Sequence, residues 1–264
     1  MGLKMKKNLT MEFDYEDVRS FRIGTLIVLE PKTDAIKTLF NFEESFGLMD
    51  WMDMIAKDNS IKGILFIGNE ECFSNNVYSK YMSSITEQYI DPQQPRFVTE
   101  FVDKRKREIQ INMLNNYIRK IIEFPKMVFI ALTGCVVSPF FGISLVSDFR
   151  IASPNLVIHK NSKEYGLHPS GGVPLFLMKH IGLSKAQEIL YSQRFIKVND
   201  AKEMGLLNYL TSVDNYRNDV LSIAIEIINS TNVEYFFYTK KLVNHILLNE
   251  FNAYVDIESN MALH

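Results

Sequence analysis

Blocks of apolar residues predict several short strands in the first two thirds of the chain. Residues 21–29 are rich in β-forming side chains and end before Pro31, which has no N–H to donate to a strand ladder. Residues 64–67 lie between two glycines, and residues 127–132 are followed closely by Gly134. Both runs are almost entirely apolar, which is typical of strands buried on both faces. We also expect short strands at 149–152 and 156–158.

Helical spacing of apolar residues appears between these strands. Residues 43–57 carry apolar side chains one helical turn apart, and a longer helix is expected at 97–123, ended by Pro125. The charged segment 103–108 is expected to be a solvated face of that helix. The polar segment 83–96 contains two prolines and predicts a loop. A short helix is expected at 142–147.

Helices dominate the last third of the chain. Ser184 is a suitable N-cap for a helix at 185–192, and Gly205 is a suitable stop for the next one. Together these patterns predict an α/β fold, divided into an α/β core at 1–192 and a helical region at 193–264 that packs against other subunits. The remaining helices are expected at 216–229, 234–248 and near 255–261.

Composition narrows the class of protein. The 264 residues are 47% apolar and 23% charged, with a net charge of -2, which argues against nucleic-acid binding because such proteins usually carry a positive excess. Cys72 and Cys135 do not have a metal-ligand spacing, so no metal is expected. The N-terminus lacks the apolar core of a secretory signal, and the longest apolar run, 127–137, is too short to span a bilayer. We therefore expect a cytoplasmic protein without membrane contact.

Four segments carry a family resemblance. The apolar run 124–134 ends in Gly134, and Asp148 follows fourteen residues later. Residues 169–172 read Pro-Ser-Gly-Gly, and residues 201–208 read Ala-Lys-Glu-Met-Gly-Leu-Leu-Asn. In this order and spacing they resemble the crotonase superfamily, the enoyl-CoA hydratase/isomerase family, over roughly residues 21–252.

The resemblance implies a crotonase-like spiral of β-β-α units with a helical C-terminal region. It also implies an acyl thioester as ligand, linked to coenzyme A or to a carrier protein, with no other cofactor. Such proteins form homotrimers or hexamers. Relatives usually continue beyond the position of His264 with a helix that packs on a neighbouring subunit, so either the tail is truncated or the trimer contacts differ.

The family's chemistry depends on two backbone N–H groups that hold the thioester oxygen, because these donors stabilise the charge of an enolate. The resemblance places the first donor at Val77. The second falls on Pro139, which has no N–H, although a shifted loop could offer the N–H of Phe140. This departure puts the enolate chemistry in doubt.

The two carboxylates of the hydratases are also missing. By spacing, their positions are occupied by Gly142 and Ser162, neither of which can move a proton near neutral pH. Glu164, two residues from Ser162, could be a relocated base, or it could be a surface carboxylate. His159 could be an acid or base, or a structural histidine.

The resemblance implies contacts to the CoA moiety from Lys32, Phe73 and Asn76, with Lys32 meeting a phosphate, but an exposed lysine without that role is the favoured interpretation of Lys32. Three hypotheses follow. The chain could act on an acyl thioester through nonstandard enolate chemistry, or it could be a catalytically silent crotonase fold that serves as a binding or scaffold protein. An ordinary hydratase is the third hypothesis, and the missing carboxylates oppose it.

Overall fold

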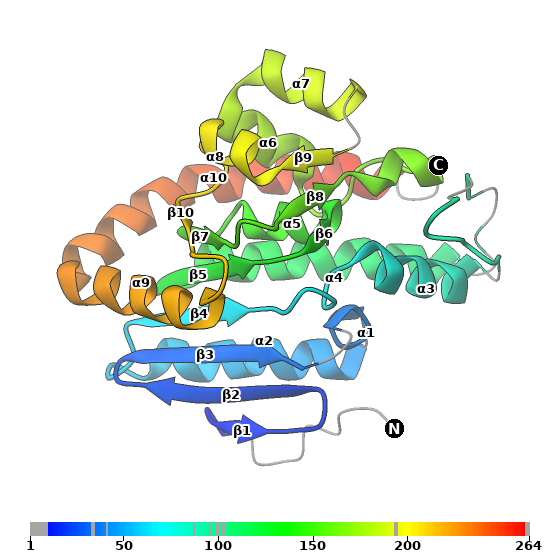
Figure 1. Ribbon diagram of the computed structural model, residues 1–264. Helices are drawn as coiled ribbons and strands as arrows, with labels where there is room; N and C mark the ends of the chain where they lie inside the picture. Colours follow the sequence, from blue (N-terminus) through cyan, green and yellow to red (C-terminus); the bar gives the residue numbers. More distant parts are fainter. Residues whose placement is uncertain are drawn as a thin grey trace.

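The computed structural model describes residues 10–32, 35–40, 42–86, 88–94, 97–98, 101, 104–192 and 195–261 (Figure 1). Within them, seven strands form the main sheet in the order β1-β2-β3-β4-β5-β7-β10. The first three strands pair antiparallel, and from β3 onward every pair is parallel. These strands are β1 (Phe13–Asp14), β2 (Val18–Ile23), β3 (Leu26–Pro31), β4 (Gly63–Ile67), β5 (Met127–Leu132), β7 (Phe149–Ala152) and β10 (Tyr209–Leu210).

A hairpin lies within the stretch 21–29 that the sequence predicts to be β-structure. The chain turns at Gly24 and Thr25, so that β2 and β3 are neighbouring antiparallel strands with Ile23 opposite Leu26. Gly24 has φ +59°, a left-handed backbone that glycine adopts without a steric penalty. The predicted β-structure in this stretch thus belongs to two strands joined by a turn at one glycine.

A second, three-stranded sheet stands beside the first. It consists of β6 (Cys135–Val137), β8 (Val157–His159) and β9 (Phe195–Lys197), with β6 and β8 parallel and β8 and β9 antiparallel. Because β5 leads directly into β6, the chain passes from one sheet to the other at Thr133 and Gly134. The mixed α/β fold that the sequence predicts is confirmed.

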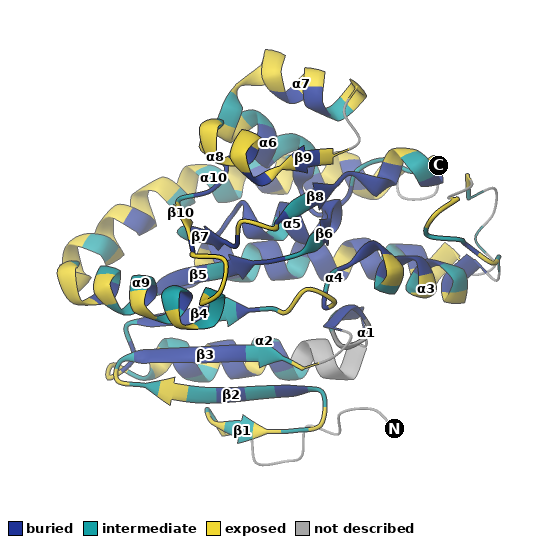
Figure 2. Ribbon diagram, in the orientation of Figure 1, coloured by how far each residue is buried: buried dark blue, intermediate teal, exposed yellow. Residues whose placement is uncertain are grey.

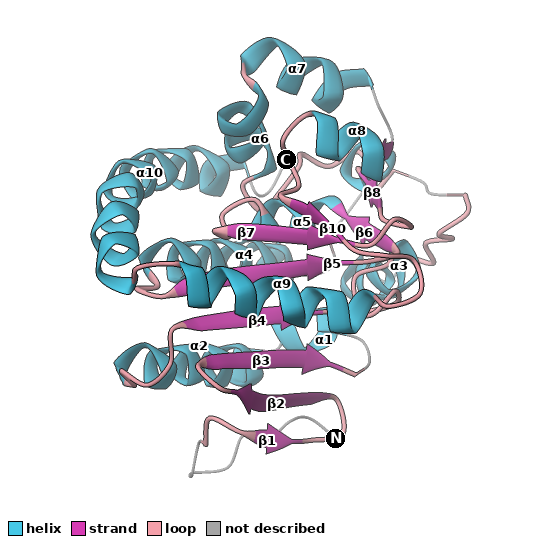
Figure 3. Cartoon of the chain, turned by 60° about the vertical axis from the view of Figure 1, so that its left-hand side comes forward, coloured by secondary structure: helices cyan, strands magenta, loops and turns pink. Residues whose placement is uncertain are grey.

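Helices cover both faces of the main sheet and fill the end of the chain. Alternate residues of β3 point to opposite faces, as the pleat requires: Leu26 and Val28 pack toward α9, while Ile27 and Leu29 join the larger core. Figure 3 shows α9 across one face and α2 and α4 behind the other, and Figure 2 shows the buried strands between them. The helices are α1 (Ala35–Phe40), α2 (Phe42–Lys57), α3 (Asn75–Thr86), α4 (Lys104–Glu123), α5 (Ser138–Ser144), the 3₁₀-helix η1 (Asn161–Tyr165), α6 (Val173–Ile181), α7 (Leu183–Ser192), α8 (Val198–Glu203), α9 (Tyr216–Ser230) and α10 (Val233–Met261).

Three helix predictions need correction. The helix expected at 142–147 begins four residues earlier, because Pro139 in its first turn needs no N–H partner there. The helix expected at 97–123 begins at Lys104. The helices expected at 234–248 and 255–261 are one continuous helix, α10.

The loop expected at 83–96 is helical as far as Thr86, and residues 87, 95 and 96 lie outside the described residues.

A buried ion pair fixes α10 to the main sheet. The Lys240 ammonium donates to Asp148 at 2.6 Å and to the Lys126 carbonyl at 2.9 Å, and Asp148 also accepts the Val128 N–H at 2.7 Å. Burial raises the pKa of Asp148 and lowers the pKa of Lys240, because the low-dielectric interior opposes both charged forms. The family-like aspartate therefore has a structural role here.

Much of the remaining surface of α10 is exposed and apolar. The exposed side chains recur about one turn apart along the helix. No helix among the described residues is long and apolar enough to cross a membrane. Exposed apolar side chains in the first half of α10 include Tyr235, Tyr238, Leu242, Val243 and Ile246.

Candidate functional site

The loop after β4 leads into α3, and Val77 lies in the first turn of that helix. Ser74 caps the helix: its carbonyl accepts the Tyr78 N–H at 3.0 Å, and its Oγ accepts the Val77 N–H at 3.3 Å. The expected first donor to a thioester oxygen therefore already has a side-chain acceptor. Asn76, in the same turn, is exposed.

The loop after β6 is the first turn of α5. Val137 donates its N–H to the Phe73 carbonyl at 3.1 Å, which ties this turn to the loop after β4. Pro139 lies in the first turn of the helix and supplies no N–H. The Phe140 ring is buried and lies 4.7 Å from the Phe73 ring, centroid to centroid. The two loops thus meet through aromatic side chains.

Gly142 lies in α5 where no side chain fits. A Cβ atom built there would be 2.1 Å from the Gly171 carbonyl oxygen and 2.7 Å from Cγ2 of Val173. The turn that contains Gly171 has φ +73° at that residue, and a Cβ on Gly171 would be 2.3 Å from the Pro139 carbonyl oxygen. The backbone of Gly171 and the side chain of Val173 therefore occupy the position where the resemblance places a carboxylate.

Ser162, the other empty carboxylate position, belongs to a buried network of uncharged polar groups. Its hydroxyl is 3.1 Å from the Ser138 hydroxyl, and Ser138 lies 3.5 Å from Oδ1 of Asn161. The Asn161 amide and the Tyr165 hydroxyl both donate to Oδ1 of Asn75, at 3.2 and 3.1 Å. All five side chains are buried. This arrangement can bind a polar group, but it offers no carboxylate that could move a proton.

Glu164 and His159 contact each other. Oε1 of Glu164 is 2.9 Å from Nε2 of His159, and both side chains are largely buried. The imidazole also lies 4.5 Å from the Phe195 ring in β9. The sequence treated Glu164 and His159 as separate candidates, whereas the structure makes them one pair between η1 and β8.

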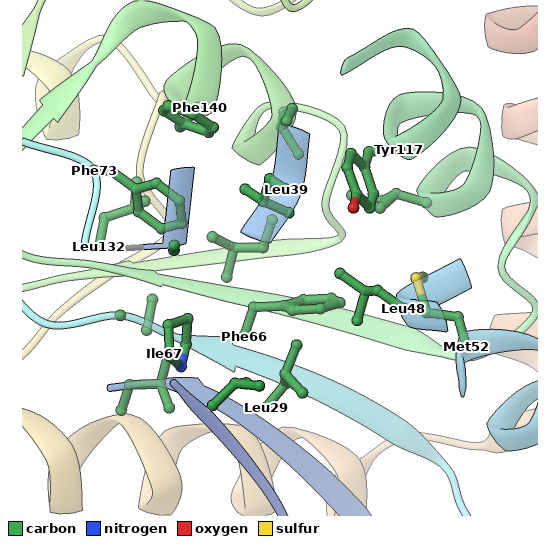
Figure 4. A pocket seen from close by; sticks show the side chains of 18 of the residues that line it. Leu29, Leu39, Leu48, Met52, Phe66, Ile67, Phe73, Tyr117, Leu132 and Phe140 are labelled. Atoms are coloured by element: carbon green, nitrogen blue, oxygen red, sulfur yellow. The ribbon is translucent and has the colours of Figure 1, made fainter. Parts of the chain in front are cut away.

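An apolar pocket of about 120 Å³ lies between the main sheet and helices α1, α2, α4 and α5 (Figure 4). Figure 4 shows Phe73 and Phe140 at one end, and Leu48 and Met52 at the other. Among the described lining residues, only Asp17 has a charged side chain. An apolar cavity of about 150 Å³ is enough to stay dry and take up benzene. This pocket therefore suits a small hydrocarbon group, with the aromatic rings of the two loops at one end. Further lining residues are Leu29, Leu39, Phe66, Leu132 and Tyr117.

The amino-acid sequence matches a known protein family. The sequence profile described as "Enoyl-CoA hydratase/isomerase" matches residues 97–264, more than half of the chain. The chain belongs to the enoyl-CoA hydratase/isomerase family.

Individual relatives in this family are distant. The chain is 27% identical over 131 residues to the short-chain-enoyl-CoA hydratase of Clostridioides difficile, covering 50% of this chain and 80% of that protein. It is 22% identical over 197 residues to a probable enoyl-CoA hydratase of Mycobacterium avium, covering 75% and 68%. The crystal structure of an enoyl-CoA hydratase from Bacillus halodurans superposes with a TM-score of 0.72 at 16% identity, covering 94% of each chain. That likeness shows the shared crotonase fold.

Within this member of the enoyl-CoA hydratase/isomerase family, the remaining candidate residues lie in different surroundings. Lys32, expected at a CoA phosphate, forms an ion pair with Asp14 and donates to the Tyr15 carbonyl at 2.8 Å. Phe73 lines the apolar pocket, whereas neither Glu164 nor His159 is among its described lining residues. The candidates named from the sequence therefore fall into separate places.

Sequence reasoning missed two parts of the site. The helix and strand residues that enclose the apolar pocket were read only as core. On α4, Arg107, Gln110, Leu114 and Tyr117 recur at intervals of three and four residues and are all buried. That spacing was the available signal that Arg107 faces inward, and the expectation of a solvated charged face was wrong for this residue.

Proposed function

We propose that the chain binds an acyl thioester of coenzyme A without hydrating it, and that the apolar pocket receives the hydrocarbon part of the acyl group. The observation that carries the proposal is the pocket itself, bounded by Phe73 and Phe140 from the two loops. Family membership supports coenzyme A as the carrier, and no other cofactor is needed.

The contents of the site argue against water addition. Hydration needs groups that activate water and transfer a proton, and each such group typically contributes about 10² to 10⁴-fold in rate. Backbone fills the space beside Gly142, and Ser162 bonds to another serine. The Val77 N–H is engaged by Ser74, and Pro139 has none, so an enolate would gain little stabilisation. A catalytically silent binding protein therefore fits this chain better than an enzyme with nonstandard chemistry.

Calorimetry with a series of CoA ligands tests the proposal. Each buried CH₂ adds about 0.8 kcal/mol, so hexanoyl-CoA should bind roughly 10-fold more tightly than butyryl-CoA. Leu39→Trp should fill the pocket and remove this dependence on chain length, while Ile109→Trp, on the exposed side of α4, should preserve it. If neither CoA nor any acyl-CoA binds, the proposal fails.

A spectroscopic assay of crotonyl-CoA hydration tests the absence of chemistry. We expect no turnover above that of a preparation lacking the protein. Turnover at ordinary enzyme rates, roughly 1 to 10³ per second, would show that proton-transfer groups are present after all.

We also propose that the exposed apolar side chains of α10 are covered by other copies of the chain in a cytoplasmic homotrimer or hexamer. The five side chains named above are between 59% and 74% exposed, too many for a helix that stays in water. Light scattering should give three or six copies, and Leu242→Glu with Ile246→Glu should lower that number. A monomeric unaltered protein at micromolar concentration would contradict this part.

A further inference from the structure

Arg107 is a buried cation near the start of α4. Its side chain is 1% exposed, whereas Lys104, Arg105 and Lys106 just before it are exposed. Nη1 donates to Oε1 of Gln110 at 2.8 Å, and the guanidinium lies 6.0 Å from the centre of the Phe101 ring. Nε is buried and has no hydrogen-bond partner among the described residues.

No carboxylate in the described part of the chain pairs with this guanidinium. Glu258 is close enough to feel the Arg107 charge, but its oxygens accept from the Asn115 amide at 2.8 Å and from the Tyr254 hydroxyl at 3.0 Å. Removing a charge from water without a partner costs several kcal/mol, so buried cations in proteins are normally paired. The described residues therefore supply no directly bonded counter-ion to Arg107, and a bound anion would supply one.

His168 supplies a second buried nitrogen without a partner. Its Nε2 makes no hydrogen bond to any described residue. Burial, and then the nearby Arg107 charge, lowers the pKa of His168 to about 4, so the ring is neutral at pH 7 and can carry its proton on Nε2. Nε of Arg107 and Nε2 of His168 thus both lack a hydrogen-bond acceptor among the described residues. The two side chains lie close enough for the charge of Arg107 to act on His168.

These groups are connected to the loops of the site. The Gln110 amide, which holds Arg107, donates to the Tyr78 hydroxyl at 3.1 Å, and Tyr78 follows Val77 in α3. His168 is followed by the turn whose Gly171 packs on Pro139. Arg107 and His168 are not among the described lining residues of the apolar pocket, but these contacts join them to α3 and to the turn beside α5, the two helices whose first turns form the loops of the site.

We propose that Arg107 and His168 bind a free carboxylate on the acyl group, so that the ligand is a thioester of a dicarboxylic acid that also carries hydrocarbon. This inference rests on the proposed function. A carboxylate matches the planar guanidinium and accepts two hydrogen bonds at once. A CoA phosphate carries a bulky nucleotide, and a side chain that is 1% exposed does not suit it.

Calorimetry with matched ligands tests the inference. Malonyl-, succinyl- and glutaryl-CoA are each compared with the monoacid thioester of equal carbon number, propionyl-, butyryl- and valeryl-CoA. For at least one length, the diacid should bind roughly 10- to 100-fold more tightly. Arg107→Met should abolish that preference without weakening the binding of CoA itself. The matched control, Lys106→Met, alters an exposed cation on the same helix and should keep the preference.

The possible failures are distinguishable. If no CoA ligand binds, the proposed function fails. If diacid and monoacid thioesters of every length bind equally, the proposed function stands and the carboxylate site is refuted, whether or not Arg107→Met folds. If Arg107→Met weakens all CoA ligands equally, including free CoA, the cation recognises a phosphate and the inference is also refuted.

Discussion

Two buried cations in this protein have opposite surroundings. Lys240 meets Asp148 and a backbone carbonyl, so its charge is neutralised within the chain. Arg107 is more deeply buried, and among the described residues its guanidinium donates to the neutral Gln110 and lies near an aromatic ring, with no carboxylate bonded to it. The first arrangement joins α10 to the sheet, and the second leaves a cation without a directly bonded carboxylate in the described part of the chain. Burial alone therefore does not tell what a charged residue does; its partners do.

The largest expected effect comes from breaking the paired site. Lys240→Met leaves Asp148 buried and unpaired, which should lower the free energy of unfolding by about 3 to 5 kcal/mol. Urea denaturation measures the loss. Lys241→Met, an exposed neighbour on the same helix, should change it by less than about 0.5 kcal/mol. A loss below about 1 kcal/mol for Lys240→Met would show that the pair is not structural.

A second substitution should recover part of that loss. In Lys240→Met with Asp148→Asn, the amide oxygen can still accept the Val128 N–H, but no charge remains buried. The double variant should therefore be about 2 kcal/mol more stable than Lys240→Met alone. Equal stability of the two variants would mean that the charge of Asp148 does not cause the loss.

Substitution of Arg107, the cation without a bonded carboxylate, should change the free energy of unfolding much less than substitution of Lys240. Without ligand, Arg107→Met removes a buried charge that has no counter-charge and costs one hydrogen bond to Gln110. The free energy of unfolding should stay within about 1 kcal/mol of its original value. Thermal unfolding of the ligand-free protein measures this. A loss as large as that of Lys240→Met would remove the contrast between the two cations.

The smallest effect is the pH dependence from His168. Its pKa is lowered from 6.5 to about 4 in the folded protein, so the unfolded chain binds the proton first as the pH falls. The stabilisation is complete above pH 6.5 and is lost between pH 6.5 and 4, with a slope below the roughly 1.4 kcal/mol per pH unit that one proton gives. His168→Gln should flatten this part of the urea-derived stability curve. An unchanged slope would indicate that the imidazole is not buried beside Arg107.

The sequence predicted the parts that depend on local pattern. The strands at Ile64 and Met127 follow from apolar runs with glycines nearby, and the family resemblance together with its spacing predicts that Gly142 stands at a carboxylate position. Position 142 also illustrates the limit, because the carbonyl of Gly171 that fills the space comes from another segment. Arg107 is similar: its surroundings join α3, α4 and the segment of His168, and no local pattern reveals that they meet.

The close approach of Gly142 and Gly171 has a consequence for how this sequence can change. Glutamate at position 142 would collide with backbone, so that substitution alone would destabilise the fold before it could supply a carboxylate. Moving the Gly171 turn first would open a cavity with no benefit in itself. A path to glutamate at position 142 therefore requires at least two coupled substitutions, each unfavourable alone. Single substitutions that each preserve stability do not lead to that change.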